Sequence, residues 1–231
     1  MIEIHPLAGI PEVTAGDDLS ALLAAALQEL RPVAGDVLVI THKVVSKAEG
    51  ATARLVGEED PAYRDLVEEE AVEILRRRGG LVIAKTRHGF ICANAGVDRS
   101  NTEPGTAVLL PRDPDRSAHR IRTALQRRLG VDLPVIITDT FGRAWRRGLC
   151  DVAIGISGID AILDLRGTTD DFGRELSVTE VAVADEIAAA ADLAMGKATQ
   201  RPAALVRGLG LPPGEGRATD LVRDPPEDLF R

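Results

Sequence analysis

The residues best suited to chemistry in this chain stand at the end of a short apolar run. Val135–Thr138, preceded by Pro134, predicts a buried strand that ends at Asp139 and Thr140. Three arginines follow, namely Arg143, Arg146 and Arg147. A carboxylate and a hydroxyl at a strand tip could hold a divalent metal, and guanidinium groups could bind the phosphate oxygens that the metal neutralises. A turn cap beside solvated arginines explains the same residues, and for an Asp-Thr pair alone it is the favoured interpretation.

A second candidate site is the loop NAGVDRSN, which packs several oxygen-bearing side chains around a glycine. It contains Asn94, Gly96, Asp98, Ser100 and Asn101. Such a loop is either a set of turns or a cradle for a cation and a phosphate. The spacing of these residues does not choose between the two interpretations.

A third candidate is the segment THKVVSKAEG, which follows a predicted strand over Val37–Thr41. That strand delivers His42, Lys43, Ser46 and Lys47 into the segment. Lys47 could reach a phosphate group, but a lysine that faces water from the first part of a helix fits the sequence equally well.

The elements that must position these residues alternate between apolar strands and amphipathic helices, so the chain is predicted to be a mixed α/β (α+β) protein. Further strands are predicted over 2–5, Leu81–Lys85, Phe90–Ala93, Thr106–Leu110 and within 202–209. Helices are predicted over Leu19–Leu30 with Asp17 or Asp18 as the N-cap, over Pro61–Arg78, over Asp113–Leu129, and from a capping box at Ser177–Glu180 to Met195.

Two glycines in the apolar stretch that follows the central strand suggest close packing. Gly155 and Gly158 lie within Ala153–Leu165, which we interpret as buried backbone. A glycine in such a stretch allows another segment to approach closely.

Composition places the chain among soluble globular proteins and excludes several classes of function. It has 231 residues, is 45% hydrophobic and carries a net charge of −8, which argues against a general role in binding nucleic acid. Two cysteines make no disulfide framework or tetrahedral zinc site. The N-terminus lacks the features of a secretory signal, and acidic residues interrupt the most apolar helix, so we expect a cytoplasmic protein that does not cross a membrane.

Several well-known catalytic and nucleotide-binding motifs are missing from the sequence. It has no phosphate loop of the G-x-x-x-x-G-K-[ST] type, no G-x-G-x-x-G after a strand and no G-x-S-x-G elbow. The four histidines are scattered, and for each we expect a loop or surface position rather than a role as catalytic base. Any phosphate chemistry must therefore depend on the three candidate segments.

An ordered set of motifs resembles the coenzyme F420-0:L-glutamate ligase family, also called the F420 gamma-glutamyl ligases. The motifs are GxPE near the start, VLVITHKVVSKAEG, ICANAGVDRSN, ITDTFGRAWRRG, AIGISG, FGRELSVTEVAVADEIAAAADLAMG and PAALVRGL. Together they run from about position 2 to 216, and the strings GVDxSN and ITDTxGRxxRxG are specific. The resemblance implies one gamma-glutamyl ligase domain over 1–231, without the C-terminal reductase-like domain found in some relatives, and the family's fold as an intertwined homodimer.

The resemblance also implies an activity, its substrates and its cofactors. The implied reaction couples GTP hydrolysis to the addition of L-glutamate to coenzyme F420-0, followed by extension of a gamma-linked glutamyl tail, in coenzyme F420 biosynthesis. The implied route passes through an acyl phosphate. The implied ions are Mg²⁺ or Mn²⁺, with two divalent ions per site, and K⁺ is a further candidate.

Matching motif to motif assigns roles to individual residues. The metal ligands are Asp98, Asp139 and Thr140, and the catalytic residues are Lys47, Asp98 and Asp139. The nucleotide contacts are Ile10, Pro11, Glu12, Val13, His42, Lys47, Asn101, Met195, Gly196, Lys197 and Ala198. From the residues themselves we add the hypothesis that Arg143, Arg146 or Arg147 holds the acceptor, because guanidinium groups suit its phosphodiester and carboxylates.

Some positions depart from the family pattern, and two other functions remain open. His42 stands where relatives often carry a small hydroxyl residue, and Arg147 where asparagine is common. Lys197 stands where a metal-binding residue is expected, which leaves the ligand set of the second metal incomplete. A metal-dependent phosphohydrolase or a non-catalytic GTP-binding module could use the same aspartates.

Overall fold

The structure, a computed structural model, describes residues 1–55 and 60–228 and is built on a mixed five-stranded sheet. In spatial order the strands are β1 (Glu3–Pro6), β12 (Ala203–Arg207), β2 (Val37–Thr41), β8 (Val135–Arg143) and β9 (Arg146–Ser157). Only β2 and β8 pair in parallel, while the other neighbours are antiparallel. The mixed α/β prediction is confirmed, with β2 and β8 side by side at the centre.

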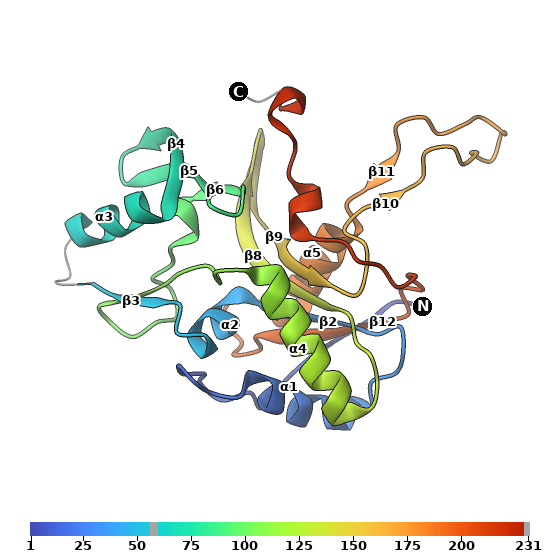
Figure 1. The fold of residues 1–231 in the computed structure, drawn as a ribbon, viewed down its shortest axis with the longest axis horizontal. Coiled ribbons are helices and arrows are strands. Elements are labelled where there is room, and N and C mark those ends of the chain that lie inside the picture. Colours follow the sequence, from blue (N-terminus) through green and yellow to red (C-terminus); the bar gives the residue numbers. More distant parts are fainter. Residues whose placement is uncertain (56–59, 229–231) are drawn as a thin grey trace.

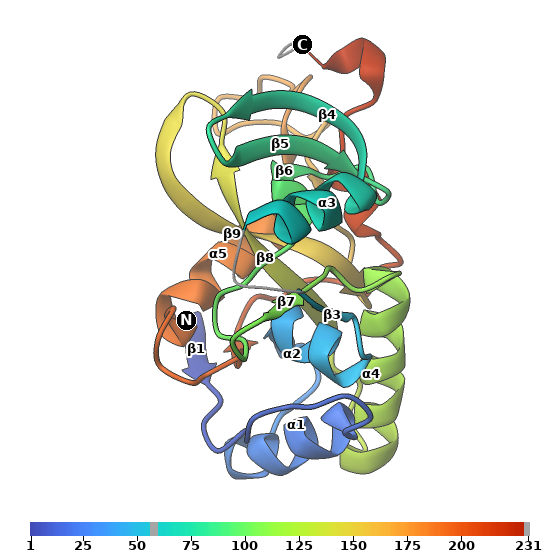
Figure 2. The same ribbon diagram turned by 90° about the vertical axis from the view of Figure 1, so that its left-hand side faces the viewer.

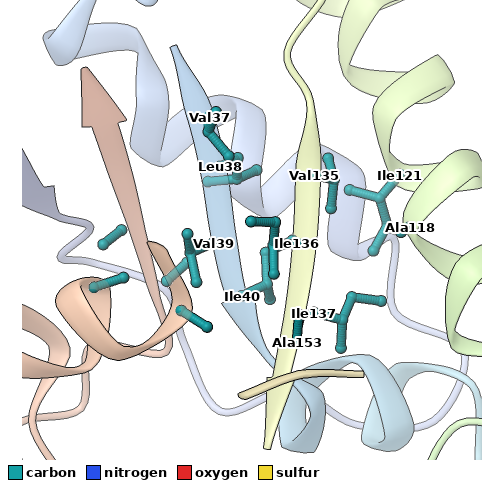
Figure 3. Close-up of a cluster of buried hydrophobic side chains, with 14 of the residues drawn as sticks. Val37, Leu38, Val39, Ile40, Ala118, Ile121, Val135, Ile136, Ile137 and Ala153 are labelled. Atoms are coloured by element: carbon teal, nitrogen blue, oxygen red, sulfur yellow. The ribbon is translucent and has the colours of Figure 1, made fainter. Parts of the chain in front are cut away.

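Helices cover both faces of this sheet. Helix α4 (Pro114–Leu129) lies on one side with α1 (Leu19–Leu27) packed against it, and α5 (Val183–Met195) lies on the other side (Figures 1 and 2). Figure 3 shows the side chains of Val135 and Ile137 pointing toward α4, while the intervening Ile136 points away from it. Strands buried on both faces read as continuous apolar runs, which explains the sequences VLVI and VII in β2 and β8.

A smaller antiparallel sheet with its own apolar cluster lies beside the main one. It consists of β4 (Ala71–Arg78), β5 (Leu81–Thr86) and β6 (Ile91–Ala93) and packs with helix α3 (Asp60–Glu70) (Figure 2). Its cluster includes Val67 of α3 and Val82 and Ala84 of β5. The remaining helix is α2 (His42–Ala48), and two short strand pairs are β3 (Thr52–Arg54) with β7 (Thr106–Val108) and β10 (Leu163–Asp164) with β11 (Glu180–Val181). Single 3₁₀ turns occupy Gln28–Leu30, Asn94–Gly96, Ala218–Leu221 and Pro225–Glu227.

The prediction of one helix over 61–78 was wrong in its second half. The helix ends at Glu70, and Ala71–Arg78 forms a strand that pairs with β5 across a turn at Gly79 and Gly80. Pairing with β5 satisfies the backbone groups of this segment and overrides its helical periodicity. Arg76, Arg77 and Arg78 therefore lie on a strand and not at the end of a helix.

We predicted that the central strand ends at Asp139 and Thr140, but it continues to Arg143. Asp139 pairs with Val152 and Thr140 pairs with Asp151, within a long β8–β9 hairpin that extends beyond the other strands (Figure 1). A register shift after Ile137 marks the point where the apolar run gives way to polar residues. Such a bulge re-aims side chains without ending the strand, because β9 continues to supply hydrogen bonds.

Other boundaries were confirmed or need small corrections. The strand at Val37–Thr41, the Asp18 N-cap and the AALVR strand agree with the prediction, and Asp113 caps α4. The capping box at Ser177–Glu180 was wrong: α5 begins at Val183, and Glu180 belongs to β11. Alpha-helix α1 ends at Leu27, and its last predicted turn is 3₁₀.

Candidate functional site

The short helix α2 gathers predicted site residues that are far apart in the sequence. Strand β2 ends at Thr41, and α2 begins at the next residue, beside the parallel neighbour β8. Lys43 and Lys47 are four residues apart and therefore share one face of α2. His42 contacts Asp139 on β8, Lys43 contacts the NAGVDRSN loop, and Lys47 contacts both that loop and the early loop at Glu12. The structure thus places the sequence THKVVSK at the centre of the site.

Lys43 connects α2 to the NAGVDRSN loop. Its Nζ lies 2.8 Å from Oδ2 of Asp98 and donates to Oγ of Ser100 at 2.6 Å. Burial by itself would raise the pKa of the Asp98 carboxyl, but hydrogen bonds from Lys43 and from the backbone N–H of Ser100 outweigh it and lower the pKa below its ordinary value. Asp98 is therefore ionised at neutral pH and suited to bind a cation.

Lys47 connects α2 to two predicted nucleotide segments. Its Nζ lies 2.5 Å from Oε1 of Glu12, in the early loop, and donates to the backbone carbonyl of Asn101 at 2.9 Å. Residues 12, 47 and 101 therefore meet at one place. The side chain of Glu12 is 78% exposed, so this carboxylate can move away from Lys47 at little cost.

His42 is buried beside Asp139, which corrects our expectation of a loop or surface histidine. Its Nε2 lies 3.2 Å from Oδ1 of Asp139, and its Nδ1 lies 3.5 Å from Oγ of Ser46. The approach to Asp139 lacks the geometry of a hydrogen bond, and Nε2 has no other partner within the described residues. Nearby, burial and the charge of Asp139 raise the pKa of the Cys92 thiol to about 12.

Thr140 belongs to a second polar cluster, formed with three residues of β9, α5 and the loop after α5. Its Oγ1 donates to Oδ1 of Asp151 at 2.6 Å and accepts a hydrogen bond from Nζ of Lys197 at 2.8 Å. Nζ of Lys197 also lies 2.7 Å from Oδ1 of Asp151 and 2.7 Å from Oδ1 of Asp192. Burial alone would lower the pKa of Lys197, but these two carboxylates raise it above its ordinary value, so it is a cation at neutral pH.

Other predicted nucleotide residues offer mainly backbone to a ligand. The side chains of Val13 and Met195 are buried in the main core, and Ile10 packs against it. Gly196 caps α5 with a φ of 65°, while Pro11 and Ala198 are exposed. The three arginines Arg143, Arg146 and Arg147 are exposed at the far end of the β8–β9 hairpin, where Arg143 donates to the carbonyl of Arg147 at 2.8 Å.

The protein supplies only part of a metal site. No group of three or more His, Cys, Asp or Glu side chains is arranged to hold a metal ion anywhere in residues 1–55 and 60–228. Mg²⁺ is commonly bound by one or two carboxylates while waters and substrate phosphates complete the octahedron. Asp98 and Asp139 each supply one carboxylate, and they contact Lys43 and His42, respectively, at the start of α2.

Two members of the second cluster, Asp151 and Asp192, escaped the sequence analysis. Asp151 lies on β9 opposite Thr140 and is 4% exposed. A sequence signal existed, because a carboxylate directly before the apolar run VAIGIS breaks the expected pattern of a buried strand. Asp192 was interpreted only as an interruption of an apolar helix.

An apolar cavity adjoins the β8–β9 hairpin. It has a volume of about 260 Å³, and its lining includes Phe90, Phe141, Val152, Leu221 and Val222. None of the predicted metal or nucleotide residues lines it. Across the described ranges, no helix combines the length and hydropathy needed to cross a membrane.

Comparison with known proteins gives a consistent result. A family model described as F420-0:Gamma-glutamyl ligase matches residues 9–208. A protein of Methanopyrus kandleri named coenzyme F420:L-glutamate ligase is 44% identical over 251 aligned positions, which cover 100% of this chain and 98% of that protein. Proteins with the same name from Methanothermobacter thermautotrophicus and Archaeoglobus fulgidus are each 42% identical; the alignments cover all of this chain and 99% and 96% of those proteins.

Proposed function

The chain belongs to the F420-0:gamma-glutamyl ligase family, and we propose that it joins L-glutamate to coenzyme F420-0 in coenzyme F420 biosynthesis. The proposal includes GTP as the energy source and extension of the product through the γ-carboxylate of the added glutamate. Identities of 44% and 42%, over all of this chain, to proteins named for this reaction support the choice of substrates. The expected cytoplasmic location is part of the same proposal.

The observation that carries the proposal is the convergence of cations and carboxylates on α2. Lys43 with Asp98, Lys47 with Glu12, and His42 with Asp139 bring three distant segments to seven residues of helix. A nucleoside triphosphate requires this combination, because lysines bind phosphate oxygens directly while carboxylates hold a divalent ion against them. Turn caps and solvated lysines, the alternative interpretation, would not bring these pairs within 3.2 Å of one another.

The proposed chemistry activates a carboxylate that is otherwise a poor acyl donor. A carboxylate oxygen of F420-0 attacks the γ-phosphorus of GTP, the bond to the β–γ bridging oxygen breaks, and GDP leaves. The glutamate amine then attacks the acyl carbon, the amide forms, inorganic phosphate leaves and the amine gives up a proton. The negative charge on the transferred phosphoryl group must be stabilised throughout.

Individual side chains have defined tasks in this scheme. Lys47 stabilises the phosphate oxygens after Glu12 releases it, and the buried ring of His42 limits where the Asp139 carboxylate can move. Lys43 keeps the Asp98 carboxyl ionised, because its hydrogen bond lowers the pKa of that group. Asp98 and Asp139 would hold a divalent ion, Mg²⁺ or Mn²⁺, which supplies charge neutralisation and Lewis-acid polarisation when bound.

We include the intertwined homodimer and the single domain over 1–231 in the proposal. The β8–β9 hairpin extends beyond the sheet (Figure 1). Trp145 and Leu149 of this hairpin are 87% and 69% exposed. Large exposed apolar side chains on a projecting element are typical of a surface that a partner covers. This supports a second copy of the chain packed against the hairpin.

The test combines the purified chain with GTP, MnCl₂, L-glutamate and F420-0 and follows glutamyl additions by mass spectrometry. We expect successive increases of one glutamyl residue, and the loss of these products in Asp139→Asn. Asp65→Asn, which changes an exposed carboxylate on α3, is the matched control and should retain activity. GTP hydrolysis without a mass increase would favour a phosphohydrolase, and GTP binding without turnover would favour a non-catalytic module.

A further inference from the structure

The ammonium group of Lys197 is held by three oxygens from three different elements. Oδ1 of Asp151 on β9 and Oδ1 of Asp192 on α5 each lie 2.7 Å from Nζ, and Oγ1 of Thr140 on β8 lies 2.8 Å away. A lysine ammonium has three N–H donors, so each donor has one acceptor. The arrangement is a small oxygen cage filled by a cation of the chain itself.

The buried carboxylate of Asp151 requires a positive charge in this cage. The residue is 4% exposed, and its two oxygens accept hydrogen bonds from Thr138 at 3.0 Å and from Thr140 at 2.6 Å. A buried carboxylate is stable only where a counter-charge offsets its lost hydration. Lys197 supplies that counter-charge, and Asp192 adds a second negative charge that strengthens the requirement.

The cage adjoins the predicted metal site at Asp139. Thr140 contributes Oγ1 to the cage, while its backbone N–H donates to Oδ1 of Asp139 at 2.7 Å. The resemblance to the family implied two divalent ions with Thr140 as a ligand. At this position, however, Thr140, Asp151 and Asp192 all bind one ammonium, and a Mg²⁺ ion about 2.1 Å from the same oxygens would occupy the place of Nζ. Asp98 differs, because Lys43 contacts this single carboxylate through Oδ2, whereas Lys197 binds two carboxylates at once.

We propose that Lys197 is a built-in cation that replaces the second divalent ion, so that the site of this chain takes one divalent ion, at Asp98 and Asp139, instead of two. The ammonium provides positive charge next to that ion without a metal-binding equilibrium of its own. The catalytic meaning of this charge rests on the proposed function, but the number of bound ions does not. Metal binding by this chain should consequently depend on the concentration of the divalent ion as expected for a single binding site.

The test counts bound Mn²⁺ by electron paramagnetic resonance in a buffer without K⁺, with no substrate present. Wild type should bind one Mn²⁺ per chain. Lys197→Gln removes the ammonium and leaves Asp151 and Asp192 facing one another, so we expect one additional Mn²⁺ per chain. Lys85→Gln is the matched control, because it removes a lysine charge on β5 outside the cage and should leave the count at one.

A second pair of variants keeps the test decisive if Lys197→Gln is unstable. Lys197→Arg retains a cation and should bind one Mn²⁺. Lys197→Gln combined with Asp139→Asn should still bind one Mn²⁺, now in the cage, and Mn²⁺ should raise its melting temperature more than that of Asp139→Asn alone. Two ions on wild type, or no additional ion and no Mn²⁺-dependent stabilisation in Lys197→Gln, would overturn the proposal. Because F420-0 and GTP are absent, failure of the ligase assay would leave this result unchanged.

Discussion

Nε2 of His42 lies 3.2 Å from Oδ1 of Asp139, in a place where the two side chains are only 1% and 13% exposed. One residue is the first of α2, and the other is in the middle of β8, so the contact joins a helix start to the central strand. The same carboxylate oxygen accepts the backbone N–H of Thr140 at 2.7 Å. Oδ1 of Asp139 therefore has a hydrogen bond from Thr140 on one side and the buried ring of His42 on the other.

We expect His42→Gln to weaken Mn²⁺ binding and glutamyl addition by about 10–100-fold, because residues that orient a ligand commonly contribute this much. Mn²⁺ titration and the glutamyl-transfer assay measure the two effects. His119→Gln, at an exposed position on α4, should change neither quantity. Unchanged Mn²⁺ affinity in a folded His42→Gln variant would contradict the positioning role.

Gly155 tests the packing that holds β9 against α4. A Cβ atom at this position would lie 2.5 Å from the backbone oxygen of Pro114, at the start of that helix. Gly155→Ala should therefore lower the free energy of unfolding by about 1–3 kcal/mol, and the melting temperature by several degrees, because the backbone must shift. Urea unfolding measures the loss. Gly80→Ala, whose Cβ would meet nothing within 4 Å, should be nearly neutral, and equal stability of the two variants would refute this account.

The parts of the fold that sequence could predict are those where local pattern and tertiary environment agree. Val37–Thr41 is uniformly apolar and lies in a sheet covered on both faces, so its strand was predicted to the residue. The close approach expected at Gly155 is also present. Ala71–Arg78 has helical periodicity but forms a strand, since a hairpin with β5 was available. Nonlocal strand pairing determined the secondary structure of Ala71–Arg78, and a single sequence does not show which pairing will form.

Some residues of the candidate site could also be predicted from the sequence, whereas others depend on how the strands pair. The motifs located Lys47 in one segment and Asp98 and Asn101 in another, and the structure brings Lys47 and Asn101 into direct contact. Asp151 was missed because its significance depends on register: it matters only because β9 places it opposite Thr140. The buried state of His42 was missed for a related reason, since only the parallel pairing of β2 and β8 brings it beside Asp139.

Asp185 gives the protein a carboxylate whose effect on stability depends on pH. Burial raises its pKa above the ordinary value of 3.8, although a hydrogen bond from the backbone N–H of Ala153 at 2.8 Å partly offsets the rise. Between pH 3.8 and that higher pKa, the folded chain binds more protons than the unfolded chain. The stability contributed by Asp185 is thus fully present below pH 3.8 and is lost as the pH rises through the folded pKa. Asp185→Asn keeps an acceptor but does not titrate, so its stability relative to wild type should increase over this window and then level off.

Urea unfolding of both proteins from pH 3.5 to 8 measures this difference, and titrations common to both cancel. Asp132→Asn provides a control of opposite sign. Hydrogen bonds from Arg122, with Nε donating at 2.7 Å, lower the pKa of Asp132, so its contribution is present above pH 3.8 and is lost as the pH falls through the folded pKa. The stability of Asp132→Asn relative to wild type should therefore decrease as the pH rises. A flat or falling difference for Asp185→Asn would show that burial does not raise the pKa of Asp185 in the folded protein.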